Sequence, residues 1–333
     1  MTTALVTGAA GFIGFHLCRH LLAEGWTVIG FDAVTDYYDP QLKEARLDIL
    51  RADPKFTEIR AALETPGALD NAFAQYRPDV VVHLAAQAGV RYSLEAPESY
   101  VNANLIGTFR VLEAARAYPP AHLLMASTSS VYGANDEYPY AEAQKADSPM
   151  SFYAATKKAN EAMAHSYAHL YGLPITMFRF FTVYGPWGRP DMALFKFTNA
   201  ILKGEPIDIY NHGQMERDFT YIDDLVEAVL RLIPAVPVRG QPVPGDSLSP
   251  VAPWRVVNIG NDSPVPLMEY VAAVEDALGT KAQKNMMPIQ PGEVPRTWAD
   301  VTLLHRLTGF RAKTDVATGV RAFVDWYRGF YGA

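Results

Sequence analysis

The chain has 333 residues, of which 49% are hydrophobic and 20% charged, and it carries a formal net charge of −7. This composition is typical of a globular protein with one large domain or two smaller ones, and the acidic balance without a basic stripe argues against a nucleic-acid partner. The single cysteine, Cys18, excludes an internal disulfide framework and a cluster of thiolate metal ligands.

Strand-like apolar runs alternate with longer segments of helical spacing through the first half of the chain. The predicted strands lie at 4–7, 27–31, 80–84, 122–127 and 175–181, and the predicted helices at 12–24, 97–117 and 151–171. Such alternation predicts an α/β fold with a Rossmann-type, doubly wound parallel sheet that has helices on both faces. The continuously apolar strands are typical of a sheet that is covered on both sides.

After about Phe181 the segments become shorter and richer in proline and glycine, with helices predicted at 193–203, 223–232, 267–278 and 315–327. We therefore assign residues 1–181 to the Rossmann domain, with parts of 214–232 and 255–262 returning to it. Residues 182–333 are assigned mainly to a smaller α/β lobe. The proline-rich segment 234–253 has little periodicity and is expected to be an exposed, mobile insertion.

A glycine-rich loop, Gly8–Gly14 in the spacing GxxGxxG, follows the first strand and opens the first helix. Glycines at these places permit a tight turn and a close backbone approach to a pyrophosphate, which free helix-start amides attract. Asp32 ends the second strand, where a carboxylate binds the adenosine ribose and repels a 2′-phosphate. Because Ala33 follows it and not a cation, we predict NAD as the cofactor.

Tyr153 and Lys157 are spaced four apart on a predicted helix, so both side chains lie on one helix face. A nearby ammonium favours the phenolate and is expected to lower the tyrosine pKa toward a useful range. The pair alone is common and would indicate no more than a surface helix. Here, however, hydroxyl-rich residues 127–133 follow the fifth strand, at the carboxyl edge where such sheets bind ligands.

The order of glycine loop, acidic strand end, Asn104, Thr128, Tyr153 and Lys157 resembles the extended short-chain dehydrogenase/reductase family, and residues 83–87 match its fourth-strand motif. Longer strings at 85–93, 180–192, 210–213 and 217–224 resemble UDP-glucuronate 4-epimerases within that family. The similarity covers nearly the whole chain.

The resemblance implies a set of site residues. The implied catalytic residues are Thr128, Tyr153 and Lys157. The implied cofactor-binding residues are Gly8, Gly11, Phe12, Ile13, Gly14, Asp32, Leu63, Leu84, Ala85, Ala86, Gln87, Asn104, Tyr153 and Lys157. The implied substrate-binding residues are Arg91, Thr128, Ser129, Ser130, Tyr153, Thr182, Arg189, Tyr210, Arg217 and Glu293.

Two positions depart from the pattern of the family. The family commonly has Gly-Asp-Leu after the third strand, where its aspartate meets the adenine, but this chain has Ala62 before Leu63. We therefore expect an adenine contact through the backbone and weaker retention of NAD. Glu293 stands where the family usually has aspartate, in the segment that resembles the contact with the uridine ribose.

The hydroxyl-rich loop separates the candidate reactions. Sugar 4,6-dehydratases carry Asp-Glu after the threonine and UDP-glucuronate decarboxylases carry a nearby Glu, whereas Thr128 is followed here by Ser129 and Ser130. Thr182, where UDP-glucose epimerases have asparagine, leaves room for a sugar carboxylate, and Arg189 can bind it. The resemblance thus implies reversible C4 epimerisation of UDP-glucuronic acid to UDP-galacturonic acid, through a 4-keto intermediate and transient NADH. The alternatives are a UDP-glucuronate decarboxylase, a UDP-glucose-type 4-epimerase and, more distantly, a non-catalytic NAD-binding regulator.

Other features predict partners and location. His165 and His169 have metal-ligand spacing but no third ligand, so they are interpreted as packing residues and no metal is predicted. The family resemblance implies a homodimer formed through a four-helix interface around 97–117 and 151–171. No apolar run reaches the roughly 18 residues needed to span a bilayer. The first strand begins near Thr3, which leaves no room for a signal peptide, so a cytoplasmic protein without a membrane partner is expected.

Overall fold

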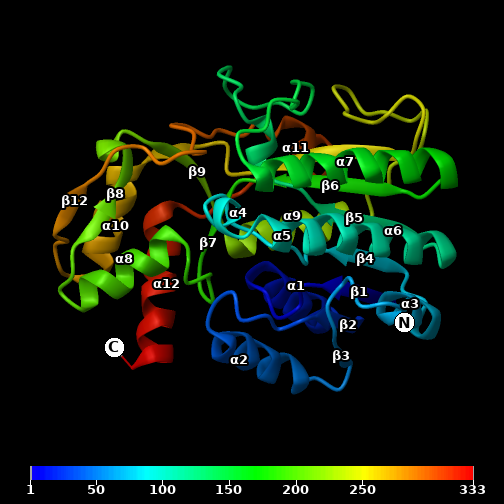
Figure 1. Ribbon diagram of the computed structural model, residues 1–333, viewed down its shortest axis with the longest axis horizontal. Helices are drawn as coiled ribbons and strands as arrows, with labels where there is room; N and C mark the ends of the chain where they lie inside the picture. The colour runs from blue at the N-terminus through cyan, green and yellow to red at the C-terminus, as the bar shows by residue number, and fades with distance from the viewer. Residues whose placement is uncertain (1, 333) are drawn as a thin grey trace.

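The computed structural model describes residues 2–332 and is organised around a sheet of seven parallel strands (Figure 1). The strands are β1 (Thr3–Thr7), β2 (Thr27–Asp32), β3 (Phe56–Arg60), β4 (Val80–His83), β5 (His122–Ala126), β6 (Ile175–Phe180) and β10 (Trp254–Ile259). Their order is β10-β6-β5-β4-β1-β2-β3, so the direction of winding reverses between β1 and β4. The predicted Rossmann-type fold is confirmed, and this reversal point is where such sheets bind ligands.

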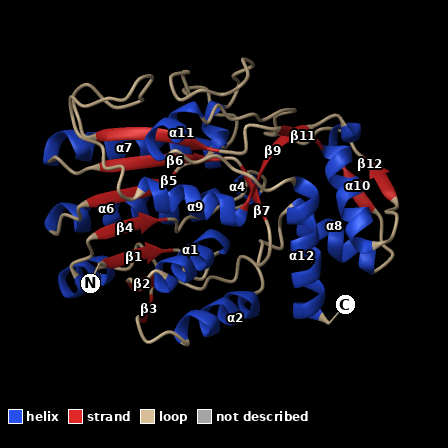
Figure 2. Ribbon diagram, turned by 180° about the vertical axis from the view of Figure 1, so that it is seen from behind, coloured by secondary structure: helices blue, strands red, loops and turns tan. Residues whose placement is uncertain are grey.

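Helices cover both faces of the sheet, as the front and rear views show (Figures 1 and 2). One face carries α1 (Phe12–Ala23), α2 (Pro40–Arg51), α9 (Ile222–Leu232) and α11 (Thr302–Thr308), and the other carries α3 (Ala68–Tyr76), α6 (Gly107–Ala117) and α7 (Phe152–Tyr171). Neighbouring strand residues face opposite cores: Val6 and Val82 pack in the first, and Leu5 and Val81 in the second. Burial on both faces explains the continuously apolar strands.

The long helix predicted over 97–117 is interrupted in the structure. It consists of α5 (Pro97–Tyr100), the wider π-helical turn η1 (Val101–Ile106) and α6, and the short α4 (Tyr92–Glu95) precedes it. Such turns insert an extra residue and are frequent at functional sites. The buried Asn104 lies in this turn, where its side chain pairs with the backbone of Gln87 through hydrogen bonds of 2.8 and 3.0 Å.

The smaller lobe has its own core, where the rings of Phe219 and Tyr270 stack at 3.9 Å. Its helices are α8 (Ala193–Leu202), α10 (Leu267–Leu278) and α12 (Val316–Tyr331), and it also contains the 3-10 turn η3 (Tyr210–Gly213). One sheet consists of β7 (Thr182–Tyr184), β9 (Glu216–Tyr221) and β11 (Pro264–Pro266). A second sheet pairs β8 (Ile207–Ile209) with β12 (Lys284–Met286). The sequence predicted the three helices but not the strands of three residues, which are too short for alternation to be visible.

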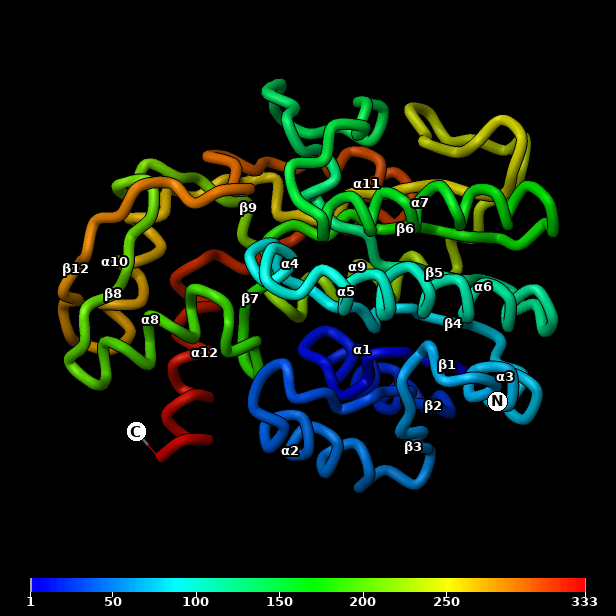
Figure 3. Tube along the Cα trace, in the orientation of Figure 1, coloured from blue at the N-terminus to red at the C-terminus, as the bar shows by residue number. Residues whose placement is uncertain are grey.

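The segment 234–253 has neither helix nor strand, but it is bound to the surface beside α7 (Figure 3). His165 Nε2 lies 2.8 Å from Ser249 Oγ, and His169 Nδ1 lies 2.9 Å from the carbonyl oxygen of Val251. A buried ion pair of 2.9 Å joins Asp246 to Arg255 at β10. These contacts attach parts of the segment to α7 and β10 and show the two histidines in a packing role, while the mobility of the segment stays a prediction.

Residues 2–332 contain neither a candidate metal site nor a candidate membrane-spanning helix. No three histidine, cysteine or acidic side chains in this range are grouped to hold a metal ion. Within the same range, no helix combines the length and apolarity needed to cross a bilayer.

Candidate active site

A cavity of about 1050 Å³ opens where the strand ends of the large sheet face the smaller lobe. Every predicted site residue except Asn104 lines it. Asn104 lies behind the wall, where it holds the backbone of Gln87 and donates a 3.0 Å hydrogen bond to Thr156. The structure therefore brings together residues that are up to 285 positions apart in sequence, from Gly8 to Glu293.

The glycine-rich loop has the shape that a dinucleotide requires. Gly8 adopts a left-handed conformation (φ +77°), and its amide donates a 2.7 Å hydrogen bond to the carbonyl of Phe31. A side chain at Gly14 would place its Cβ 2.0 Å from the carbonyl oxygen of Gly8, so close packing of α1 on β1 requires glycine there. No side chain of the described residues caps α1 at Gly11, which leaves its first amides free for a phosphate.

Asp32 is fixed at the end of β2 with its carboxylate at the cavity wall. Its two oxygens accept hydrogen bonds from the amides of Ala10 (3.0 Å) and Val34 (2.8 Å). On β4, which is separated from β2 by β1, His83 is buried, which lowers its pKa to about 3 and keeps the ring neutral. The Asp32 carboxylate fits NAD, because it can bind the adenosine ribose hydroxyls and would repel a 2′-phosphate.

Tyr153 and Lys157 project from α7, whose N-terminus is capped by Ser151 through a 3.1 Å hydrogen bond. Lys157 Nζ donates a 2.9 Å bond to the carbonyl of Ala126, and burial lowers the pKa of the ammonium to about 8. Burial raises the pKa of Tyr153, while a hydrogen bond with Thr128 and the charge of Arg189 oppose this effect.

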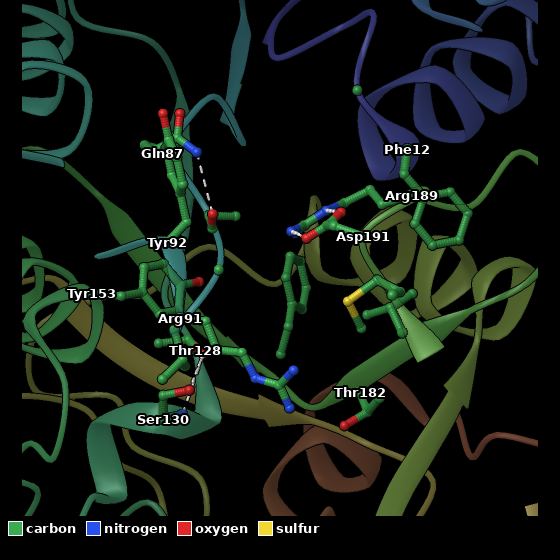
Figure 4. Close-up of a pocket in the computed structure, with 18 of the residues that line it drawn as sticks. Phe12, Gln87, Arg91, Tyr92, Thr128, Ser130, Tyr153, Thr182, Arg189 and Asp191 are labelled. Carbon is green, nitrogen blue, oxygen red and sulfur yellow. Dashed lines mark hydrogen bonds and ion pairs between the residues drawn. The ribbon is translucent and has the colours of Figure 1, made fainter. Parts of the chain in front are cut away.

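Thr128, Ser129 and Ser130 form the cavity wall beside Tyr153, at the start of the turn η2 (Ser129–Tyr132) (Figure 4). The hydroxyl of Thr128 donates to Ser130 Oγ at 3.2 Å and accepts from the amide of Ser130 at 3.2 Å. These three side chains offer only hydroxyl groups to a ligand.

Behind this loop lies a buried carboxylate that does not line the cavity. Ser127 donates a 2.7 Å bond to Glu161, which also pairs with the buried Arg179 at 2.8 Å. This ion pair lowers the pKa of Glu161 and fixes the back of the hydroxyl-rich loop.

Arg189 lies across the cavity from the hydroxyl-rich loop, beside Phe12 (Figure 4). Its Nε donates a 3.0 Å bond to Asp191, which also accepts a 3.2 Å bond from the hydroxyl of Tyr37. Asp191 was not among the predicted site residues, and its signal in the sequence is only that of an acidic residue two positions after a candidate arginine. Arg189 has further N–H groups with which to bind a ligand.

The two other predicted arginines differ in their pairing. Arg91 Nε donates a 3.0 Å bond to Glu293, and its guanidinium lies 4.2 Å from the centre of the Tyr210 ring. Arg217 on β9 donates only to backbone carbonyls, those of Glu216 (2.9 Å) and Pro295 (3.1 Å). Because no carboxylate in residues 2–332 pairs with Arg217, its charge is available to an anionic ligand.

Comparison with known proteins identifies the family. Residues 4–242 match the NAD dependent epimerase/dehydratase family. The chain belongs to this family. The predicted family and the predicted cofactor, NAD, are thereby confirmed.

Relatives resemble the chain over its whole length. A probable UDP-glucuronate 4-epimerase from Rhizobium meliloti is 57% identical over 97% of this chain and 96% of the relative. A UDP-glucuronate 4-epimerase of Arabidopsis thaliana is 46% identical over 99% of this chain and 72% of its own length. The crystal structure of a Bacillus cereus UDP-glucuronic acid 4-epimerase, in complex with UDP-glucuronic acid and NAD, superposes with a TM-score of 0.89 at 32% identity, covering 99% of this chain and all of the other.

Proposed function

We propose that this protein is an isomerase that interconverts UDP-glucuronic acid and UDP-galacturonic acid by inverting C4. The observation that carries the proposal is a cavity lined by Tyr153 and Lys157, by the hydroxyl groups of residues 128–130 and, on the opposite wall, by Arg189. The relatives named as UDP-glucuronate 4-epimerases support the same substrate. In this proposal the Rossmann domain binds NAD, and the smaller lobe supplies contacts to the UDP-sugar.

Tyr153 is the proton-transfer residue of the proposed reaction. Its phenolic oxygen takes the proton of the 4-hydroxyl during oxidation and returns a proton after the sugar has turned over, with the Thr128 hydroxyl beside it. NAD, when bound, supplies the oxidising and then the reducing chemistry at C4. Lys157 would hold the nicotinamide ribose, because its ammonium is buried next to the end of β5.

The remaining residues position the substrate. Arg217 faces the diphosphate, which must stay bound while the 4-keto sugar rotates. Arg91, Tyr210 and Glu293 form a cluster that is suited to the uridine ribose. The sugar carboxylate is held by Thr128, Ser129, Ser130, Thr182 and Arg189.

Holding the carboxylate also protects the intermediate. A 4-keto uronic acid is a β-keto acid, which loses carbon dioxide when the C5–C6 bond aligns with the carbonyl π system. Contacts from the hydroxyl-rich loop and from Arg189 keep that bond out of alignment. This restraint, together with the lack of a carboxylate beside Thr128, favours epimerisation over decarboxylation or dehydration.

Proton NMR of the purified protein with UDP-glucuronic acid, and no added cofactor, tests this function. We expect a growing UDP-galacturonic acid signal without UDP-pentose. A UDP-pentose signal would instead establish a decarboxylase. Turnover of UDP-glucose alone would establish a neutral-sugar epimerase, and no turnover of any UDP-sugar after addition of NAD would favour a regulator.

The predicted homodimer also remains a proposal. Large apolar side chains on α6 and α7 are exposed, among them Phe109 at 39%, Leu170 at 63% and Tyr171 at 42%. Two copies that paired these helices would cover the apolar surface with a four-helix interface. Light scattering after size exclusion should give twice the chain mass of 36.7 kDa, and a mass of one chain would reject the interface.

A further inference from the structure

The short segment 185–188, which leads into Arg189, is held by two side chains of the cofactor-binding half of the molecule. His16 Nε2 on α1 lies 3.0 Å from the carbonyl oxygen of Pro186. Arg46 Nη2 on α2 donates to the carbonyls of Trp187 (2.6 Å) and Gly188 (3.4 Å). Three consecutive carbonyls are therefore fixed immediately before the arginine that faces the cavity.

The same guanidinium also shapes the glycine-rich loop. Arg46 Nη1 donates a 2.8 Å bond to the carbonyl of Ala10 and a 2.7 Å bond to the hydroxyl of Tyr38. Arg46 thus joins three separate segments: the dinucleotide loop, the loop after β2 and the segment before Arg189. A second bridge runs parallel to it, from Tyr37 through Asp191 to Arg189.

Arg46 is an unusual residue from the viewpoint of stability alone. Its side chain is completely buried, and no carboxylate of residues 2–332 forms an ion pair with it. A buried charge that is solvated only by carbonyls and a hydroxyl is expensive, and an apolar side chain often replaces such a group without loss of stability. The cost of burying Arg46 therefore points to a role in arranging the site.

The segment that Arg46 holds is strained. Trp187 has φ +61°, in the left-handed region, which a bulky residue adopts only when its surroundings impose it. Its ring packs at 5.3 Å from Phe15 and 5.2 Å from Trp326. Packing fixes the ring and Arg46 fixes the carbonyl, so the direction in which the chain continues to Arg189 depends on both.

We propose that Arg46 is a positioning residue for recognition of the sugar carboxylate. It holds the segment before Arg189 against the glycine-rich loop, so the arginine that meets the uronate is set by the same guanidinium that shapes the cofactor site. The identity of the ligand rests on the proposed function, whereas the order that Arg46 imposes on residues 185–192 does not.

The test compares Arg46→Lys with the matched control Arg255→Lys. Lysine keeps the charge but lacks the planar fork that reaches several acceptors at once. Arg255 is also buried, at 3% exposure, and bonds to Asp246 and the carbonyl of Ala235, but it does not line the cavity. Calorimetric titrations of each NAD-loaded variant would measure the affinities for UDP-glucuronic acid and for UDP, which lacks the carboxylate.

We expect Arg46→Lys to weaken UDP-glucuronic acid binding by about tenfold or more, which is the loss expected when one charge-assisted hydrogen bond is misplaced. The affinity for UDP should change little. Arg255→Lys should lower the melting temperature without changing the ratio of the two affinities. The proposal would be overturned if Arg46→Lys lost affinity equally for both ligands or lost none. It would also be overturned if Arg255→Lys changed the ratio of the two affinities in the same way. If Arg46→Lys does not fold, Tyr38→Phe serves as a second variant, because it removes one hydrogen-bond partner of Arg46. It should change the ratio of the affinities for UDP-glucuronic acid and UDP in the same direction, but by less. An unchanged ratio in Tyr38→Phe would then overturn the proposal.

Hydrogen exchange of the ligand-free proteins separates this proposal from the proposed function. Amides of residues 185–192 should exchange faster in Arg46→Lys than in the wild type or Arg255→Lys. If the wild type neither prefers nor converts UDP-glucuronic acid, the proposed function fails, and the exchange data alone decide on Arg46. Unchanged exchange would overturn its positioning role.

Discussion

The two walls of the cavity are built in different ways. The cofactor wall consists mainly of backbone and small side chains at consecutive strand ends, such as Gly8, Asp32 and Ala85. The substrate wall consists of charged and polar side chains from distant segments, and its arginines Arg91 and Arg189 are already paired with acidic residues. The first wall needs a local shape, whereas the second needs several long-range contacts at once. Substitutions in the two walls should therefore impair different properties of the protein.

Tyr153→Phe removes the proposed proton-transfer group, on which the reaction of the bound cofactor and substrate depends, and it has the largest expected effect. Removing the hydroxyl eliminates proton transfer, so kcat should fall by about a hundred- to ten-thousand-fold. Affinity for UDP-glucuronic acid, measured by calorimetry, should change little. A variant that retained wild-type turnover would remove Tyr153 from the mechanism.

Gly14→Ala breaks only the cofactor wall. The added Cβ would meet backbone at 2.0 Å, so the loop must shift and NAD should be lost during purification. The measurement is the nucleotide released on denaturation, quantified by chromatography. The control is Gly329→Ala on α12, where a Cβ meets nothing within 4 Å. Full NAD occupancy in Gly14→Ala would contradict the role given to the loop.

Arg189→Ala breaks only the substrate wall. Loss of a charge-assisted contact should raise the KM for UDP-glucuronic acid by about tenfold to a hundredfold. NMR of the products should also reveal UDP-pentose, because the carboxylate is less restrained. Arg231→Ala, which removes an exposed helix ion pair with Glu227, is the control. An unchanged KM without UDP-pentose would assign Arg189 another role.

Glu142→Gln leaves both walls intact and has the smallest expected effect. Burial, and to a lesser extent the neighbouring Asp300, raise the pKa of Glu142 from 4.5 to about 7, although its carboxylate accepts a 2.8 Å bond from the amide of Asn258. A carboxyl whose pKa is raised by folding loses stability as pH increases from about 4.5 to about 7. Glutamine keeps the acceptor and carries no charge.

The variant should therefore melt a few degrees above the wild type at pH 8, and the difference should disappear near pH 5. Thermal unfolding at both values measures this. The exposed Glu98→Gln should show no such dependence on pH. A melting difference of equal size at pH 5 and pH 8 would show that the charge of Glu142 is not its source.

The contrast between the walls also explains what the sequence could predict. Tight turns, a strand-end carboxylate and a helical spacing of four are local patterns, so the cofactor wall and the position of Tyr153 and Lys157 could be proposed without a structure. Arg46 and Asp191 gave no such signal, because their partners lie on other segments and depend on the tertiary fold. The raised pKa of Tyr153 and the lowered pKa of Lys157 could not be predicted either, since both follow from loss of hydration in the folded protein.

The seven-stranded sheet also has a consequence for biosynthesis. Strands β1 to β6 all come from the first 180 residues, but the edge of β6 is covered only by β10, which ends at Ile259. About 75 residues separate the end of β6 from the start of β10 in the sequence. During translation β6 must therefore remain an unpaired edge strand until these residues have been made. Open parallel edges recruit foreign strands. Nascent chains stalled between residues 180 and 254 should consequently be the most prone to aggregate and the most dependent on chaperones.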